Sequence, residues 1–192
     1  MKIMSNAQKI QKLKTLLKRL YWKNSKKLLF HGWHHISFVS KKAIEFAESI
    51  GANTFLAESA GLVHDLNYIV MPNSEPEAGS DLRGKILTKA GYSHDEIDRI
   101  KKIIMEAHTR TRTDKISKEG KALSDGDTLF KALPTTPILF AGKYIEQNRV
   151  NITQLAHKVS SEQNKLMKSG IYFYISKEKI YKMGQNQSCI MG

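Results

Sequence analysis

Residues 5–21, SNAQKIQKLKTLLKRLY, carry the pattern that decides the fold class of this chain. Apolar residues recur there at three- and four-residue spacing, at Ile10, Leu13, Leu16, Leu17 and Leu20. This is the period of an amphipathic helix, because residues three and four apart lie on the same face. Helical spacing recurs along nearly the whole sequence, and the strand–helix alternation that a parallel sheet needs is absent. The sequence therefore predicts an all-α fold.

Start and stop signals divide the chain into further helices. Helices are expected at about 33–50, 54–65, 81–90, 94–108, from 121, from 137 and at 151–167. Asn53 or Thr54 is expected to begin the helix at 54–65, and Ser93 and Asn151 are expected N-caps of later ones. MPNSEPEAGS, at 71–80, is the clearest loop. The only strand-like run is IYFYI, at 171–175, which equally suits a short aromatic segment that packs against the bundle.

Composition indicates one ordinary globular domain. The 192 residues are 41% hydrophobic and 26% charged, which suits a single core. The one cysteine, Cys189, excludes a disulfide framework or a zinc cluster built on thiolates. No stretch approaches the roughly 20 apolar residues of a membrane span, and the first 20 residues lack the apolar core of a secretory signal. We therefore expect a cytoplasmic protein.

The net charge of +13 is concentrated near the N-terminus. The 44 residues before Glu45 contain eleven Lys or Arg and no acid, whereas the remainder has 20 basic and 18 acidic residues, a net of +2. We expect residues 1–29 to form a basic helical arm, packed on or projecting from a single domain at 30–192. The arm is either the solvated face of a packed helix or a site for an anionic partner, nucleic acid or a lipid surface.

Four segments combine residue types that bind metals: HGWHHISFV (31–39), GLVHDL (61–66), MEAHTRT (105–111) and LSDGDTL (123–129). Imidazole nitrogen and carboxylate oxygen together suit divalent Mn, Fe, Co, Ni, Zn or Mg. The adjacent pair His64-Asp65 follows an apolar stretch, and an ionised carboxylate buried there without a partner costs several kcal/mol, at the order-of-magnitude level. A metal ion, an Arg, a Lys or a helix N-terminus would each offset that cost. A second pair, His94-Asp95, is explained by helix capping alone.

His35, His64-Asp65 and Asp125, in this order, resemble the H…HD…D pattern of the HD-domain metal-dependent phosphohydrolase superfamily. The resemblance covers about residues 30–132. HGWHHISFV is similar to the H-x-W-x-H signature of the first helix, GLVHDL to the helix end that carries the His-Asp pair, and LSDGDTLFKA to a D-A-D-R-L-D-A segment. The family is a helical bundle, so the resemblance implies an HD-type domain whose motifs lie within 30–132, with C-terminal helices at 133–192.

The resemblance implies that His35, His64, Asp65 and Asp125 hold one divalent ion, whose identity stays open. A water on that ion would attack the phosphoester of a nucleotide or of another small phosphorylated substrate. Asp65 and His108 would then be the catalytic residues, with His108 stabilising the phosphoryl group.

Other side chains are candidate substrate contacts. His31 is expected to orient the substrate or the site loop. Guanidinium groups suit phosphate oxygens, so Arg110 and Arg112, and also Arg83, are candidates for binding the phosphate. Asp127 is a candidate partner that orients one of the histidines.

Departures from the family pattern leave two alternatives. Phe38 stands where the family often has an Arg, and Asn67 and Tyr68 stand where relatives often have an acid. The first alternative is a catalytically degenerate HD-fold protein that binds a nucleotide or RNA. The second is a di-iron HD-type oxygenase, in which His31 and His108 would supply the additional ligands.

Overall fold

The computed structural model describes residues 4–108, 111–133 and 135–169, and every regular element within them is helical. The α-helices are α1 (Asn6–Lys23), α2 (Trp33–Ser49), α3 (Thr54–Val63), α4 (Asn67–Val70), α5 (Ser80–Ala90), α6 (His94–Ala107), α7 (Lys118–Ala132), α8 (Thr135–Asn148) and α9 (Ile152–Ser169), with short 3-10 turns at His64–Leu66 and Pro76–Gly79. The predicted all-α class is confirmed. IYFYI at 171–175 and Cys189 lie outside the described residues.

Local capping explains where several helices begin. The Asn53 side chain accepts a hydrogen bond from the backbone N–H of Leu56 and caps α3. Ser93 and Glu96 form a reciprocal capping box at the start of α6, which leaves fewer of its first N–H groups unsatisfied. The Ser117 side chain accepts a hydrogen bond from the backbone N–H of Gly120 and caps α7, so that helix begins at Lys118, three residues before the predicted start.

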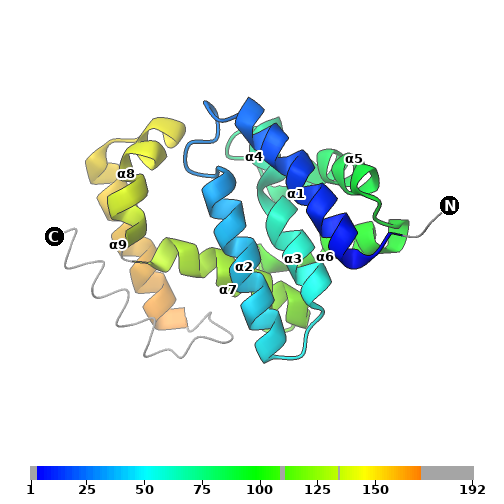
Figure 1. Ribbon diagram of the computed structural model, residues 1–192. Coiled ribbons are helices and arrows are strands. Elements are labelled where there is room, and N and C mark those ends of the chain that lie inside the picture. The colour runs from blue at the N-terminus through cyan, green and yellow to red at the C-terminus, as the bar shows by residue number, and fades with distance from the viewer. Residues whose placement is uncertain (1–3, 109–110, 134, 170–192) are drawn as a thin grey trace.

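Helix α2 is the centre of the bundle and packs most extensively against α7 and α3 (Figure 1). Glycines permit these close approaches. A Cβ on Gly61 of α3 would lie 2.7 Å from the Cα of Ser40, and one on Gly126 of α7 would lie 3.1 Å from the carbonyl oxygen of Val39. Because α2 touches both neighbours at backbone distance, polar side chains on all three helices are brought together.

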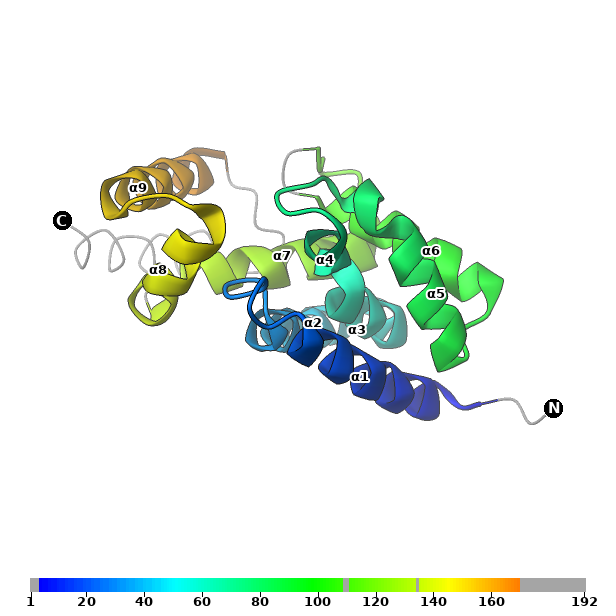
Figure 2. The same cartoon turned by 90° about the horizontal axis from the view of Figure 1, so that it is seen from above.

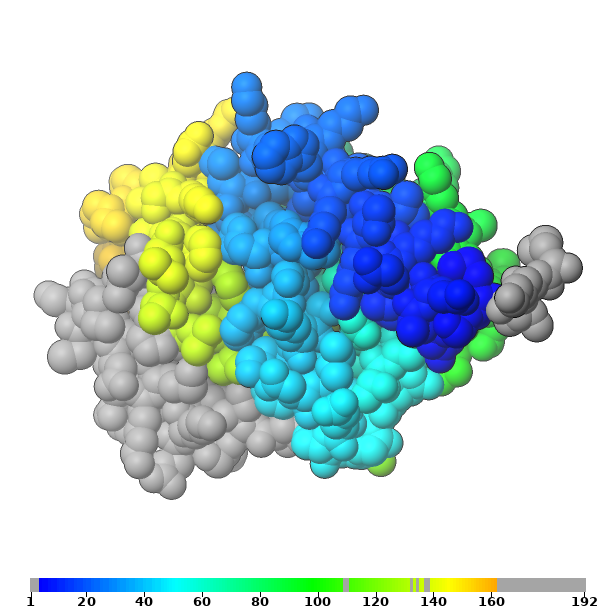
Figure 3. All heavy atoms as spheres, viewed as in Figure 1, coloured from blue at the N-terminus to red at the C-terminus, as the bar shows by residue number. Residues whose placement is uncertain are grey.

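Helix α1 is packed on the bundle over α3 and α5 rather than projecting from it (Figures 1 and 2). Leu13 and Leu17 of its apolar face are fully buried. Lys9 forms an ion pair with Glu96 at 2.7 Å, which joins α1 to α6. The face of α1 opposite Leu13 and Leu17 is exposed on the side of the molecule that Figure 3 shows.

Helices α8 and α9 stand at one end of the molecule, and α5 and α6 stand at the other (Figure 2). Helix α8 also contacts the loop before α2, where the rings of Tyr144 and Phe30 meet edge to face at 5.1 Å. Among the described residues, no helix combines the length and apolar character needed to cross a bilayer.

Candidate metal centre and its pocket

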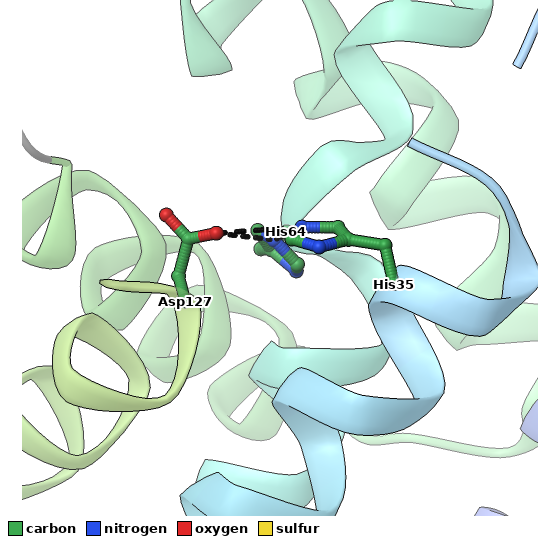
Figure 4. A group of neighbouring side chains, drawn as sticks. All are labelled: His35, His64 and Asp127. Carbon is green, nitrogen blue, oxygen red and sulfur yellow. Dashed lines mark hydrogen bonds and ion pairs between the residues drawn. The ribbon is translucent and has the colours of Figure 1, made fainter. Parts of the chain in front are cut away.

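Three helical segments bring a compact group of metal-ligand side chains together (Figure 4). His35 lies in the first turn of α2, His64 lies in the 3-10 turn that ends α3, and Asp127 lies on α7. The two histidine Nε2 atoms are 3.2 Å apart. An Asp127 Oδ1 atom lies 3.3 Å from Nε2 of His35 and 3.9 Å from that of His64. Ligand atoms of all three residues therefore converge within 4.8 Å of one another.

The carboxylate of Asp65 also faces the histidines. Its Oδ2 is 3.0 Å from Nε2 of His35, and its Oδ1 is 3.3 Å from Nε2 of His64. Burial alone would raise the pKa of Asp65, but its contacts with His64 and His35 hold that pKa well below the ordinary value. The pKa of Asp127 is also lowered, chiefly by Lys131 and His35, against the effect of burial. Both carboxylates are thus ionised at neutral pH.

The orientation of the His64 imidazole suits a metal ligand. Nδ1 of His64 lies 2.9 Å from the carbonyl oxygen of Gly61, which can only accept, so Nδ1 carries the proton. The Nε2 lone pair of His64 is therefore directed into the cluster, as a metal ligand requires. Burial lowers the pKa of His35, but its hydrogen bonds to Asp127 and Asp65 prevail and raise it to about 9. Without an ion the ring is therefore protonated at neutral pH, and it would release this proton on binding a metal. The buried Asp65 carboxylate, the partly buried Asp127 carboxylate and two imidazoles form a donor set that fits a divalent ion.

Asp127, and not the predicted Asp125, belongs to the group of side chains that could hold a metal ion. Asp125 is fully buried on α7, but it is not part of the cluster that the described residues form. The physical reason is helix geometry, because two residues along an α-helix are turned by about 200° about its axis. Asp127, which was expected to orient a histidine, does contact His35 at 3.3 Å, and it also belongs to the group that could hold an ion.

Arg83 braces the turn that carries the His-Asp pair and is not available to a substrate. It is the largest fully buried side chain, with 1% exposure. Its Nε donates to the carbonyl oxygen of Val63 at 3.2 Å, and its Nη2 donates to those of His64 and Pro76. The interpretation of Arg83 as a phosphate contact is therefore corrected. Sequence could not reveal this role because the acceptors are backbone carbonyl groups.

A pocket opens beside the cluster. Its lining residues, besides His64, Asp65 and Asp127, include His31, Asn67, Tyr68, Ser74, His108, Ser124 and Lys131. His108 follows the last residue of α6, and its Nε2 lies 3.4 Å from Oε2 of Glu75. His31 is buried and stacks on Tyr68 with ring centroids 4.0 Å apart. Desolvation lowers the pKa of His31 to about 3, so its ring is neutral. Both predicted histidines thus line the pocket.

Lys131 is a pocket residue that sequence reasoning missed. Its Nζ lies 2.8 Å from Oδ2 of Asp127, one helical turn earlier. Burial opposes its charge, but Asp127 prevails and raises the pKa of Lys131 above its ordinary value. The spacing of four residues from Asp127 was a usable signal. With Asp125 as the expected ligand, the spacing of Lys131 from Asp127 had no evident meaning.

Arg112, one of the two predicted arginine contacts, is not among the residues that line the pocket. Arg112 donates hydrogen bonds to the hydroxyl groups of Ser124 and Thr128, the latter at 3.0 Å, and so ties the loop after α6 to α7. Arg110 lies outside the described residues. Asn67, which stands at one of the missing acidic positions, donates to the carbonyl oxygen of Ser74 at 2.7 Å and holds the following loop.

Aromatic side chains cover the other side of His35. The Phe130 ring meets the imidazole of His35 edge to face at 4.7 Å, and Phe38 packs on Phe130 at 5.3 Å. Phe38, which replaces the frequent Arg, therefore belongs to an apolar wall behind the metal ligand. His35 is fully buried in front of that wall.

Comparison with known proteins gives the following findings. No protein-family model matches the chain. The uncharacterized protein YpgQ of Bacillus subtilis (strain 168) is 33% identical over 103 residues, which are 52% of this chain and half of the length of YpgQ. A crystal structure of YpgQ aligns with a TM-score of 0.70 at 21% identity and covers 98% of this chain and 94% of that one. A crystal structure of YpgQ in complex with ADP aligns with a TM-score of 0.57 at 23% identity over 84% of each chain. These structures share the fold.

Proposed function

We propose that this chain is a metal-dependent phosphohydrolase of the HD type that acts on a nucleotide or another small phosphoester. One observation carries the proposal: His35, His64, Asp65 and Asp127 converge at the side of a pocket. The order of these residues in the chain keeps the H…HD…D pattern, with Asp127 as its last member. The same fold in a protein crystallised with ADP supports a nucleotide as the substrate.

The chain's own residues suggest how the site works. A divalent ion in such a site supplies positive charge for the phosphoryl oxygens and makes water a better nucleophile. His35, His64, Asp65 and Asp127 would hold that ion. Lys131, whose ammonium group lines the pocket beside the cluster, would bind a phosphate oxygen. His108 lines the same pocket and would donate to the phosphoryl group or the leaving oxygen.

The two alternatives differ in what they require of the pocket. A di-iron oxygenase needs a second set of ligands, whereas the described residues contain one group of three or more suitable side chains. Nδ1 of His31 is engaged by Gln147, and His108 is engaged by Glu75. A binding module without catalysis needs only the pocket. Because Asn67 stands where relatives often have an acidic residue, the experiment below also tests for a binding module without catalysis.

The test is a panel of nucleotides and phosphomonoesters incubated with the full chain and Mn²⁺, Co²⁺, Ni²⁺ or Mg²⁺, with phosphate and pyrophosphate release as the readout. We expect metal-dependent release that the Asp65→Ala variant lacks. Release that persists in this variant would refute the proposed site. A nucleotide that raises the melting temperature without any turnover would favour the binding module, and iron retained after anaerobic purification would favour the oxygenase.

The exposed face of α1 supports a second, separate proposal, an anionic partner. Lys12, Lys18, Arg19 and Lys23 lie on that face, and Trp22 beside them is 84% exposed. Because the apolar face of α1 is buried in the core, a nucleic acid suits this helix better than a lipid surface. We expect salt-sensitive binding of single-stranded RNA that Lys12→Glu/Lys23→Glu weakens. Binding to anionic vesicles in place of RNA would overturn the choice.

A further inference from the structure

Gln147, on the last turn of α8, contacts the loop that carries His31, 116 residues earlier in the chain. Its Oε1 atom lies 2.7 Å from the backbone nitrogen of Phe30 and 3.2 Å from that of His31. Both backbone groups are N–H donors, so the atom between them must be the acceptor oxygen. The orientation of the Gln147 amide is therefore determined by its surroundings, and its NH₂ group is on the other side.

That NH₂ group meets the imidazole of His31. Nε2 of Gln147 lies 2.5 Å from Nδ1 of His31. An NH₂ group only donates, so Nδ1 must offer a lone pair and cannot carry a proton. The neutral ring then has its proton on Nε2. Stacking on Tyr68 at an interplanar angle of 11° and edge contact with Phe30 at 5.1 Å hold the ring plane.

We infer that Gln147 is a positioning residue that fixes His31 as a neutral imidazole with its proton on Nε2. His31, which lines the pocket, then presents a hydrogen-bond donor there and not an acceptor. A donor selects an acceptor oxygen on the bound molecule, such as a phosphate or ribose oxygen. This last step rests on the proposed function, whereas the tautomer does not. Helix α8, which contains none of the predicted metal ligands, thereby becomes part of the site.

Imidazole ¹⁵N resonances measure the tautomer directly. We propose long-range ¹H–¹⁵N correlation spectra of the full chain labelled at histidine, in Mg²⁺, with the His31 signals assigned by their loss in His31→Gln. In the wild type, Nδ1 should appear unprotonated and Nε2 protonated. In Gln147→Glu, a carboxylate replaces the NH₂ donor, so the proton of the neutral ring should move from Nε2 to Nδ1. Gln11→Glu, the same change on the exposed face of α1, should leave the His31 signals unchanged.

A protonated Nδ1 in the wild type would overturn the inference, as would an unprotonated Nδ1 in Gln147→Glu. The wild-type spectrum decides even if the variant does not fold. With a substrate found by the nucleotide panel, Gln147→Glu should raise KM roughly tenfold and change kcat less, because one neutral hydrogen bond to the bound substrate is lost. A correct tautomer without any nucleotide turnover would refute the proposed hydrolase and leave the role of Gln147 standing.

Discussion

Replacing Asp127 by Asn should abolish most of the metal affinity, whereas the same change at Asp125 should not. The Asp127 carboxylate approaches both histidine Nε2 atoms, at 3.3 and 3.9 Å. Loss of a residue that merely orients a ligand already weakens metal binding by about 10–100-fold. Loss of a charged ligand should therefore weaken it by at least about 100-fold, or about 2.7 kcal/mol.

This difference in metal affinity should appear as a difference in how far the metal raises the melting temperature, because binding stabilises the folded state by mass action. At a free metal concentration of about 100 times the wild-type Kd, binding stabilises the folded wild type by about 2.7 kcal/mol. For a chain of this size, that corresponds to a rise of roughly 5–11 °C. Asp127→Asn at the same concentration gains only about 0.4 kcal/mol, or roughly 1 °C.

The assay is thermal unfolding of each variant with and without Mn²⁺, read as the shift that the metal produces and not as the absolute midpoint. This comparison is needed because Asp125 is fully buried, so Asp125→Asn will lower the midpoint of the metal-free protein. It should nevertheless keep the full shift. A full shift in Asp127→Asn, or a shift lost only in Asp125→Asn, would refute the ligand assignment.

Three further predictions concern stability. Arg83→Met should lower the free energy of unfolding by about 3 kcal/mol or more in urea titrations, because buried carbonyl acceptors lose a charged donor; a change below 1 kcal/mol would contradict the bracing role. Burial would raise the pKa of Glu96, but the Lys9 ammonium and the Ser93 cap lower it. The contribution of these contacts to the free energy of unfolding is therefore present at pH 7 and is lost as the pH falls from 4.5 through the lowered pKa. Glu96→Gln should accordingly cost about 1 kcal/mol at pH 7, and the gap should close in acid. Gly61→Ala should cost about 1–3 kcal/mol, since its methyl would lie 2.7 Å from the α2 backbone, whereas Gly142→Ala, with nothing within 4 Å, should be neutral or stabilising.

The ligand set shows where reasoning from sequence reaches its limit. LSDGDTL contains two aspartates, and both fit an H…HD…D order. Which of them faces the histidines depends on the rotation of α7 about its axis. That rotation is set when Gly126, between the two aspartates, packs against the backbone of α2. A linear pattern identifies the segment but not the face of the helix that meets a partner.

Long-range contacts account for the other omissions. Gln147 reaches His31 across 116 residues, and Arg83 reaches the carbonyl group of Val63 across 20. Neither Gln147, the acceptor in the first contact, nor Arg83, the donor in the second, lies in a recognisable motif. An isolated Gln or Arg on a helix is usually solvated, so nothing in its neighbourhood distinguished these two.

The sequence by itself determined the helical class, the cap at Ser93, a helix start near Asn53, and the approximate positions of His35 and the His64-Asp65 pair. These features follow from interactions between residues a few positions apart, which the printed order of residues contains directly. Only the tertiary structure decided which of Asp125 and Asp127 faces the histidines. It also decided that Arg83 is buried and that α8 contributes to the pocket. Those outcomes depend on which helix faces meet, and that is settled by the packing of the whole core.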